Sequence, residues 1–360
     1  MRNRLFATVV VSIGSVASVI GAPSERTLVF DPVELVAGRE AEGDESLAVE
    51  HEGYEYRFVS RENRARFRED PWRFAAADGG ACGRMGPLSG LGDARRHLVV
   101  DKRIWFFASD GCREGFLADP ERCIERADPV PEGDDEQRAR ASQVLSRMVA
   151  WAGGRDALGA VRTYQHAIRD EFEREGGKGE HVKEVHAAFP DRFAESDRWD
   201  ERSWSRCVVG DRGLARSPDN GAAPLARDRS AAFVRRMVRL PISLIVLGGD
   251  PDAVAFARGE RRVEGVRCSL VDLHHRGATT QLCIEVETGR LVAARFVGRG
   301  PGSIVGSVER VFTAYEADGG VTVPSAWRTR FDGEFFESGS VVLDSVVINP
   351  TIDDGVFGAG

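Results

Sequence analysis

One pattern occurs twice in this chain, and it constrains the fold of the N-terminal third. The stretch FVSRENRARFREDP begins at Phe58, and FASDGCREGFLADP begins at Phe107. Before each stretch, apolar residues alternate with polar ones around a short turn, which is typical of a β-hairpin. Within each stretch, a polar segment of helix formers ends at Asp-Pro, where a helix stops. The sequence therefore predicts two hairpin–helix units, at residues 28–78 and 79–126.

Both units resemble the YHS domain, a small module whose pattern runs Asp-Pro-Val-Cys-Gly-Met, an aromatic strand, Phe-Cys-Ser-x-x-Cys and Phe-x-x-Asp-Pro. In the first unit, residues 31–33 read Asp-Pro-Val. Glu34 stands in place of the first cysteine, and Val59 and Asn63 replace the other two. The first unit thus keeps the scaffold residues of the pattern and loses its thiols.

The second unit keeps part of the cysteine pattern. Cys82 begins CGRM, which approximates Cys-Gly-Met with one extra residue, and Cys112 keeps the last cysteine. The resemblance implies a metal site, because the matching positions of YHS domains are proposed metal ligands. A soft transition metal or haem iron favours thiolates, but a tetrahedral site needs further ligands. The candidates for those ligands are Cys123, Met85 and His97. The alternative is a structural disulfide among the three cysteines, or inert thiols.

The first residues carry the features of an export signal. Arg2 and Arg4 precede an apolar run over residues 5–20, and small residues follow up to Ala22. We expect residues 1–22 to be a signal peptide that is removed on export to the periplasm or the extracellular space. Such compartments are oxidising, so the six cysteines have the opportunity to form disulfides.

Composition narrows the classes of partner and activity. The formal net charge is −8 at pH 7, and the arginines are interleaved with acidic residues. Nucleic-acid binding needs a basic stripe, so we expect no nucleic-acid partner. No nucleophile motif, paired catalytic carboxylates or phosphate-binding loop stands out, and we therefore favour a non-catalytic role.

A charged linker over residues 127–142 separates the two units from a larger C-terminal domain at residues 143–360. A helix is predicted from about residue 136 to 151, where apolar residues recur on one face. Beyond residue 162 most segments alternate in polarity or carry β-branched residues, with Gly, Asp and Pro between them, as expected for strands. One apolar helical element, residues 230–247, interrupts these strands.

The C-terminal domain resembles the lipoprotein carriers of the LolA/LolB-like fold. The stretches that carry this resemblance are GGRDALGAVRTY, VETGRLVAARF, VTVPSAWRTRFDG and LDSVVINPTIDDGVF. The resemblance implies an antiparallel β half-barrel wrapped around a helix, with an apolar cavity. The whole chain would then be of the α+β class. Known carriers of the family bind acyl chains, so the implied ligand is lipid-like.

The apolar element at residues 230–247 is where we expect the lining of that cavity. Four of its side chains are the candidate lining residues: Phe233, Met237, Leu240 and Leu244. A soft apolar lining that contains methionine suits acyl chains. The alternative is a core helix that contacts no ligand.

Cys268 and Cys283 flank a predicted hairpin that turns near residues 276–277. Neighbouring strands bring such residues close together, so the two are candidates for a cross-strand disulfide. Buried free thiols are the alternative.

The sequence therefore predicts an exported, non-catalytic protein that holds an apolar or amphiphilic ligand in its half-barrel, with a membrane-associated protein as a further partner. The alternative is a metal- or haem-handling protein that acts through the second unit. The sequence does not determine the oligomeric state.

Overall fold

The computed structural model describes residues 23–174, 177–218, 221–250 and 252–358, so the expected signal peptide at residues 1–22 lies outside it. The fold is mixed α+β with two large antiparallel sheets, as the α+β prediction required. The helices are α1 Pro32–Val36, α2 Arg61–Glu69, α3 Pro71–Phe74, α4 Asp110–Ala118, α5 Asp135–Trp151, α6 Gly154–Gly159, α7 Arg227–Val238 and α8 Pro241–Leu247. Among the described residues, no helix has both the length and the apolar character needed to cross a membrane.

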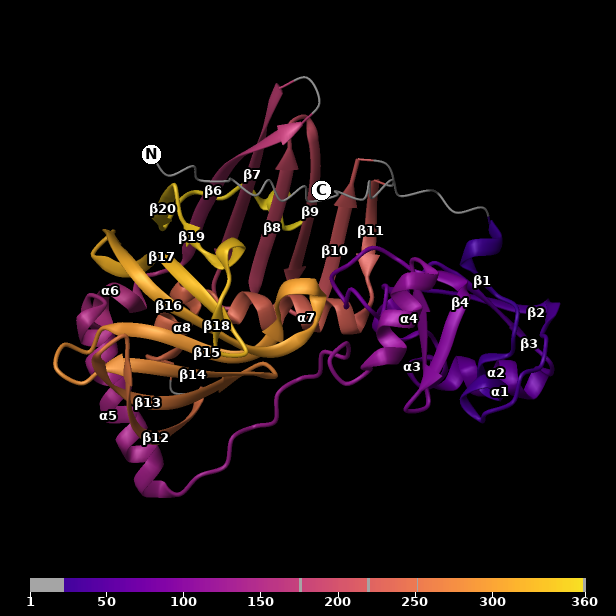
Figure 1. The fold of residues 1–360 in the computed structure, drawn as a ribbon, viewed down its shortest axis with the longest axis horizontal. Coiled ribbons are helices and arrows are strands. Elements are labelled where there is room, and N and C mark those ends of the chain that lie inside the picture. Colours follow the sequence, from indigo (N-terminus) through magenta and orange to yellow (C-terminus); the bar gives the residue numbers. More distant parts are fainter. Residues whose placement is uncertain (1–22, 175–176, 219–220, 251, 359–360) are drawn as a thin grey trace, which may run out of the picture.

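Two large sheets form the C-terminal domain. The seven-stranded sheet runs, in spatial order, β11 Gly221–Leu225, β10 Arg212–Ser217, β9 Arg202–Val209, β8 Arg192–Trp199, β7 Gly177–Ala188, β6 Thr163–Arg174 and β20 Ser345–Ile348. The eight-stranded sheet runs β12 Val254–Val263, β13 Val266–His275, β14 Ala278–Glu285, β15 Leu291–Arg299, β16 Val305–Asp318, β17 Val321–Phe331 and β18 Glu334–Phe335, with β19 Val341–Val342 also paired to β17. In Figure 1, α7 and α8 lie between the two sheets.

The predicted apolar helix at residues 230–247 is in fact two helices. The backbone of Leu240 is extended, and Pro241 begins α8 as its first residue. Proline fits this position because it has no N–H to donate and its ring clashes with a preceding helical turn. The prediction of one continuous helix was therefore wrong, although its apolar character was read correctly.

The two N-terminal units each contain a hairpin and a helix, as predicted. The first holds β1 Thr27–Leu28, β2 Asp44–His51 and β3 Tyr54–Phe58, and the second holds β4 Asp93–Val100 and β5 Arg103–Phe107. The hairpins turn at residues 52–53 and 101–102, where the backbone adopts positive φ. Figure 1 places both units at one end of the molecule, beside β10, β11 and α7.

The repeated sequence pattern contains the N-cap residue of each unit's helix and a phenylalanine of each unit's core. Ser60 and Ser109 are the N-caps of α2 and α4, and each hydroxyl accepts a hydrogen bond from the third backbone N–H beyond it, at 3.1 Å. Such a cap satisfies an N–H that the helix leaves unpaired. Phe67 and Phe116 then bury their rings against the hairpins. The same two positions, a serine N-cap and a buried phenylalanine, therefore recur in both units.

The largest apolar core lies in the C-terminal domain. It joins side chains of α5, α7 and α8 to apolar residues of both sheets. A second core fills the first unit, and a third, smaller one fills the second unit. Burial of this apolar area supplies the main driving force for folding.

The second unit is bonded to the C-terminal domain through its last residues. The guanidinium of Arg299 on β15 donates to the carbonyl oxygen of Cys123 at 2.6 Å. The N–H of Val305 donates to the carbonyl oxygen of Arg122 at 2.6 Å. Asp128, in the linker, pairs with the buried Arg239 of the segment between α7 and α8. These bonds hold the second unit against the two sheets.

Candidate functional site

All four predicted lining residues belong to the largest core. Phe233 and Met237 lie on α7, Leu240 lies between the helices, and Leu244 lies on α8. Their exposed fractions are 0%, 1%, 8% and 2%. The structure therefore places them together between the two sheets. Whether a ligand displaces part of this packing stays a prediction.

The inner face of the seven-stranded sheet changes from apolar to charged within one row of residues. The register of β6, β7, β8 and β9 places Tyr164, Ala187, Phe193 and Val208 side by side in one row, and all four are buried in the core. The next row on the same face consists of His166, Val185, Glu195 and Arg206. The apolar core thus ends directly against ionisable groups.

Glu195 is the centre of this charged row. Its carboxylate has an exposed fraction of 1% and lies 2.8 Å from Arg236 of α7, 3.0 Å from Lys183 of β7 and 3.7 Å from Arg206 of β9. Burial opposes ionisation of this group, but Arg236, Lys183 and Arg206 outweigh it and hold the pKa of Glu195 at about 2. One buried carboxylate therefore forms ion pairs with three cations.

His166 is buried beside this cluster as a neutral imidazole. Burial lowers its pKa to about 3, and the nearby positive charge of Lys183 acts in the same direction. Its Nδ1 lies 3.1 Å from the hydroxyl oxygen of Tyr164. The imidazole therefore stays uncharged across the physiological pH range.

The cationic region extends to the opposite sheet through Arg310 of β16. Its guanidinium donates to the carbonyl oxygen of Arg239 at 3.0 Å and lies over the rings of Phe296 and Trp327. Burial lowers the pKa of Arg310 to about 10, and the neighbouring cations Arg236 and Arg239 lower it further. The charges near α7 are thus predominantly positive, which favours an anionic group at this place.

Hydrogen bonds align the two N-terminal units differently from the sequence pattern. The carboxylate Oδ2 of Asp31 accepts from the backbone N–H of Val59 at 2.8 Å, and the Sγ of Cys82 accepts from the backbone N–H of Ala108 at 3.4 Å. Val59 and Ala108 each directly follow the second strand of their hairpin. Asp31 is therefore the counterpart of Cys82, and the expected alignment of Glu34 with that cysteine was wrong.

The partners of these two groups also correspond. Asn63 donates its side-chain amide to Asp31 at 2.9 Å, and Cys112, at the same position of α4, lies beside Cys82. Burial raises the pKa of the Cys82 thiol, and the adjacent Cys112 thiol raises it further. Both sulfurs are free thiols in the structure. The first unit thus has a carboxylate–amide pair, Asp31 and Asn63, where the second has a pair of thiols, Cys82 and Cys112.

The other expected metal ligands do not complete a site around this thiol pair. The sulfur of Cys123 lies in the same small core and is 4.0 Å from the carbonyl oxygen of Gly115. The Nδ1 of His97 lies 3.0 Å from the carbonyl oxygen of Ala94, and Met85 is 45% exposed. Within the described part of the chain, no three His, Cys, Asp or Glu side chains gather closely enough to hold a metal ion.

Cys268 and Cys283 lie on the adjacent strands β13 and β14, in a small core separate from the largest one. Both are buried and both are free thiols. Burial raises the pKa of Cys268 to about 11, and Cys283 contributes to this rise. The sequence placed the two residues near each other, and their oxidation to a disulfide stays a prediction.

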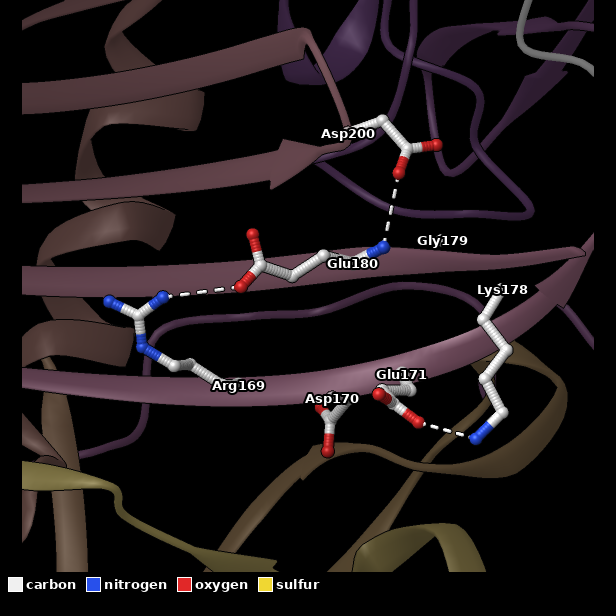
Figure 2. A pocket seen from close by; sticks show the side chains of 7 residues that line it. All are labelled: Arg169, Asp170, Glu171, Lys178, Gly179, Glu180 and Asp200. Atoms are coloured by element: carbon white, nitrogen blue, oxygen red, sulfur yellow. Dashed lines mark hydrogen bonds and ion pairs between the residues drawn. The ribbon is translucent and has the colours of Figure 1, made fainter.

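Two pockets lie away from α7. The first, of about 360 Å³, lies along the β6–β7 hairpin (Figure 2) and is lined by Arg169, Asp170, Glu171, Lys178, Gly179, Glu180 and Asp200. Its two cations already have acidic partners, with Lys178 at 2.6 Å from Glu171 and Arg169 at 3.3 Å from Glu180. The second, of about 930 Å³, lies between α5 and the strands β12 and β13. None of the four predicted lining residues borders either pocket.

Comparison with known proteins gives structural neighbours but no family. No family model matches the chain, and no curated protein matches it. The similar solved structures include a DUF1329 family protein from Desulfovibrio piger, with 12% identity, a TM-score of 0.40, and coverage of 61% of this chain and 97% of that one. They also include a LolA superfamily protein from Nitrosomonas europaea, with 10% identity, a TM-score of 0.39, and coverage of 60% and 96%. At these values the neighbours say nothing about a ligand, which has to be inferred from the residues.

The charged row around Glu195 was not found from the sequence. Its only sequence signal is spacing: Glu195 follows the apolar Phe193 by two residues, so both side chains lie on the same face of the strand. A charged residue in phase with core residues usually needs buried partners. Those partners come from the two neighbouring strands, β7 and β9, and from α7, and their convergence depends on strand register and helix packing.

Proposed function

We propose that this protein is an exported, non-catalytic carrier that binds a lipid-like amphiphile between its two sheets. The observation that carries the proposal is the boundary on the inner sheet face, where the apolar row at Phe193 meets Glu195 and the three cations that pair with it. An amphiphile matches such a boundary, because its chain is stabilised by apolar contacts and its head group by charged ones.

The apolar part of the site is the wedge formed by α7 and α8. Phe233, Met237 and Leu244 project from these helices into the core between the sheets. The ligand chain would replace part of their mutual packing, which methionine tolerates well because its side chain is flexible. A membrane-associated protein would be the donor or acceptor of such cargo.

The test begins with the full-length protein, produced with residues 1–22 and recovered from the exported fraction. Native mass spectrometry and solvent extraction should detect co-purified lipid. After lipid removal, binding of a fluorescent fatty acid is measured for the wild type and for Met237→Trp. We expect the larger side chain to lower the affinity at least about tenfold, because it fills the space that the chain needs.

A matched control separates loss of the site from general strain. Val311 on β16 is buried in the small core around Cys268 and Cys283 rather than in the largest core. Val311→Trp therefore overpacks a buried position elsewhere and should leave fatty-acid binding unchanged. Equal binding by the wild type and a folded Met237→Trp protein would refute the proposed location.

A further inference from the structure

A short segment of the second unit enters the ligand region proposed above. A glycine-rich loop connects Cys82 to strand β4. Within it lie Pro87, Leu88 and Ser89, here called the plug segment. Pro87 is buried, and the side chain of Leu88 packs against the largest core, the same one that contains Phe233 and Met237. A residue of the N-terminal units thus contributes an apolar side chain to the C-terminal domain.

All three carbonyl oxygens of the plug segment accept hydrogen bonds from two arginines. Arg229 of α7 donates through Nε to Pro87 and through Nη2 to Ser89, both at 2.8 Å. Arg206 of β9 donates through Nη1 to Leu88 at 3.1 Å. Three consecutive carbonyl groups therefore present their oxygens to two guanidinium groups, as an oxygen-rich head group would.

Arg206 lies in surroundings that would favour a full negative charge, whereas Arg229 already has the carboxylates of Asp78 and Glu52 nearby. Burial is the main cause that lowers the pKa of both Arg206 and Arg229. The closest carboxylate to Arg206 is Glu195, 3.7 Å away and shared with Lys183 and Arg236. Neutral carbonyl groups compensate buried cations less well than a carboxylate or phosphate does, because they bring no opposite charge and no bidentate pair of oxygens.

We propose that the plug segment occupies the site in which the anionic head group of an acidic amphiphile binds. Leu88 takes the place of the first part of the apolar chain, and the three carbonyl oxygens take the place of the head-group oxygens. The ligand and the plug segment then compete for Arg206 and Arg229, so binding requires the segment to leave. This inference rests on the proposed carrier function and adds the ligand class and the entry step.

The loop has the conformational means to leave. Gly86 and Gly90 border the plug segment, and Gly86 adopts a φ of +90°. The turn itself is held by the N–H and the hydroxyl of Ser89, which both donate to the carbonyl oxygen of Gly86, at 3.0 and 2.7 Å. Glycines at both borders allow the turn to move as a unit, because they tolerate backbone angles that other residues avoid.

The experiment compares oleate with monoolein, a neutral amphiphile with the same chain, on the full protein. Leu88→Ala weakens the plug segment and should tighten oleate binding about tenfold, because less of the protein is blocked. Leu91→Ala is the matched control, since Leu91 lies in the same loop but packs against the core of the first unit. Unchanged oleate affinity in Leu88→Ala would overturn the competition.

Arg206→Gln tests the head-group chemistry. It should weaken oleate binding relative to monoolein binding, because only the charged head group uses the guanidinium, while both amphiphiles gain from the lost bond between Arg206 and Leu88. Equal losses for both amphiphiles would overturn the assignment. Inorganic phosphate alone is the third probe, and release of the plug segment by phosphate without an acyl chain would overturn the amphiphile as the ligand class.

Hydrogen exchange of the wild type gives a measurement that needs no variant. Oleate should accelerate exchange of the Ser89 amide and its loop neighbours, whereas monoolein should do so less. Oleate binding without any change in this loop would overturn the plug while leaving the carrier function standing. If neither amphiphile binds the wild type or Leu88→Ala, the carrier function itself fails.

Discussion

Asp31 and Cys82 occupy equivalent places in the two N-terminal units, and each accepts a hydrogen bond from the backbone N–H that follows the hairpin. Asp31 is fully buried and also accepts from the backbone N–H groups of Val33 and Glu34. Cys82 is buried among aromatic rings. The carboxylate therefore serves as a structural centre in the first unit, and the thiol replaces it in the second.

The first prediction concerns the amide that completes this centre. Asn63→Ala removes one of the two donors to Oδ2 of Asp31, and also the donor to the carboxylate of Glu34. We expect a loss of about 1–3 kcal/mol in the free energy of unfolding, measured by urea denaturation. Cys112→Ala, the same change at the matching position of the second unit, should cost less because it removes no charged partner. Equal losses would contradict the assigned role of Asp31.

The second prediction concerns the order in which thiols react. Cys112 is the least buried of the six cysteines, whereas burial raises the pKa of Cys82, Cys207 and Cys268. A thiol reacts as its thiolate, so buried groups with raised pKa react slowly. Iodoacetamide at pH 8 should modify Cys112 first, as peptide mass spectrometry will show. A Cys82–Cys112 disulfide in the exported protein would instead leave Cys112 unmodified until reductant is added.

The third prediction concerns acid. Unfolded His166 takes up a proton near pH 6.5, whereas the folded residue does so only near pH 3. Between these values acid favours the unfolded chain, so the free energy of unfolding falls by up to about 1.4 kcal/mol per pH unit from this residue. Urea denaturation at pH 7, 6, 5 and 4 measures this slope. His166→Gln should make the slope shallower, and an unchanged slope would contradict the prediction.

The fourth prediction concerns the centre of the charged row. Glu195→Gln removes the carboxylate that Lys183, Arg206 and Arg236 share. These cations are partly exposed, so we expect a loss below the about 3–5 kcal/mol that breaking a fully buried pair costs. Glu309→Gln is the matched control, because Glu309 is less completely buried and pairs with two cations, Arg261 and Arg330, instead of three. Its loss should be smaller. Thermal and urea denaturation of the two variants decide the comparison.

Local patterns predicted much of the fold. The hairpins, α2 and α4 followed from turn residues, helix-forming residues and the Asp-Pro stops, all of which act within a few residues. Individual strands were less evident in the sequence, as β11 and β12 illustrate. β11 and β12 lie at sheet edges, where one side needs no partner and the alternation of apolar residues is weak. Pro224 sits within β11, which only an edge strand tolerates.

The charged part of the candidate site could not be predicted in the same way. The environment of Glu195 is set by its ion pairs with Lys183, Arg206 and Arg236, which belong to three other elements. The loop that carries Leu88 was recognised only as glycine-rich, and its contacts depend on how the second unit meets the C-terminal domain. Such arrangements follow from tertiary packing, which short-range patterns do not record.

The last strands give the C-terminal domain a particular order of assembly. β19 pairs with β17 of one sheet, and β20, three residues later, pairs with β6 of the other. Asn349 then accepts from the backbone N–H of Arg162, 187 residues earlier in the chain. During synthesis, one edge of β6 therefore stays without its partner strand β20 until nearly all of the domain has left the ribosome. Contacts of such long range slow folding, so a chain cut short before β20 would expose an unpaired strand edge to association with other molecules.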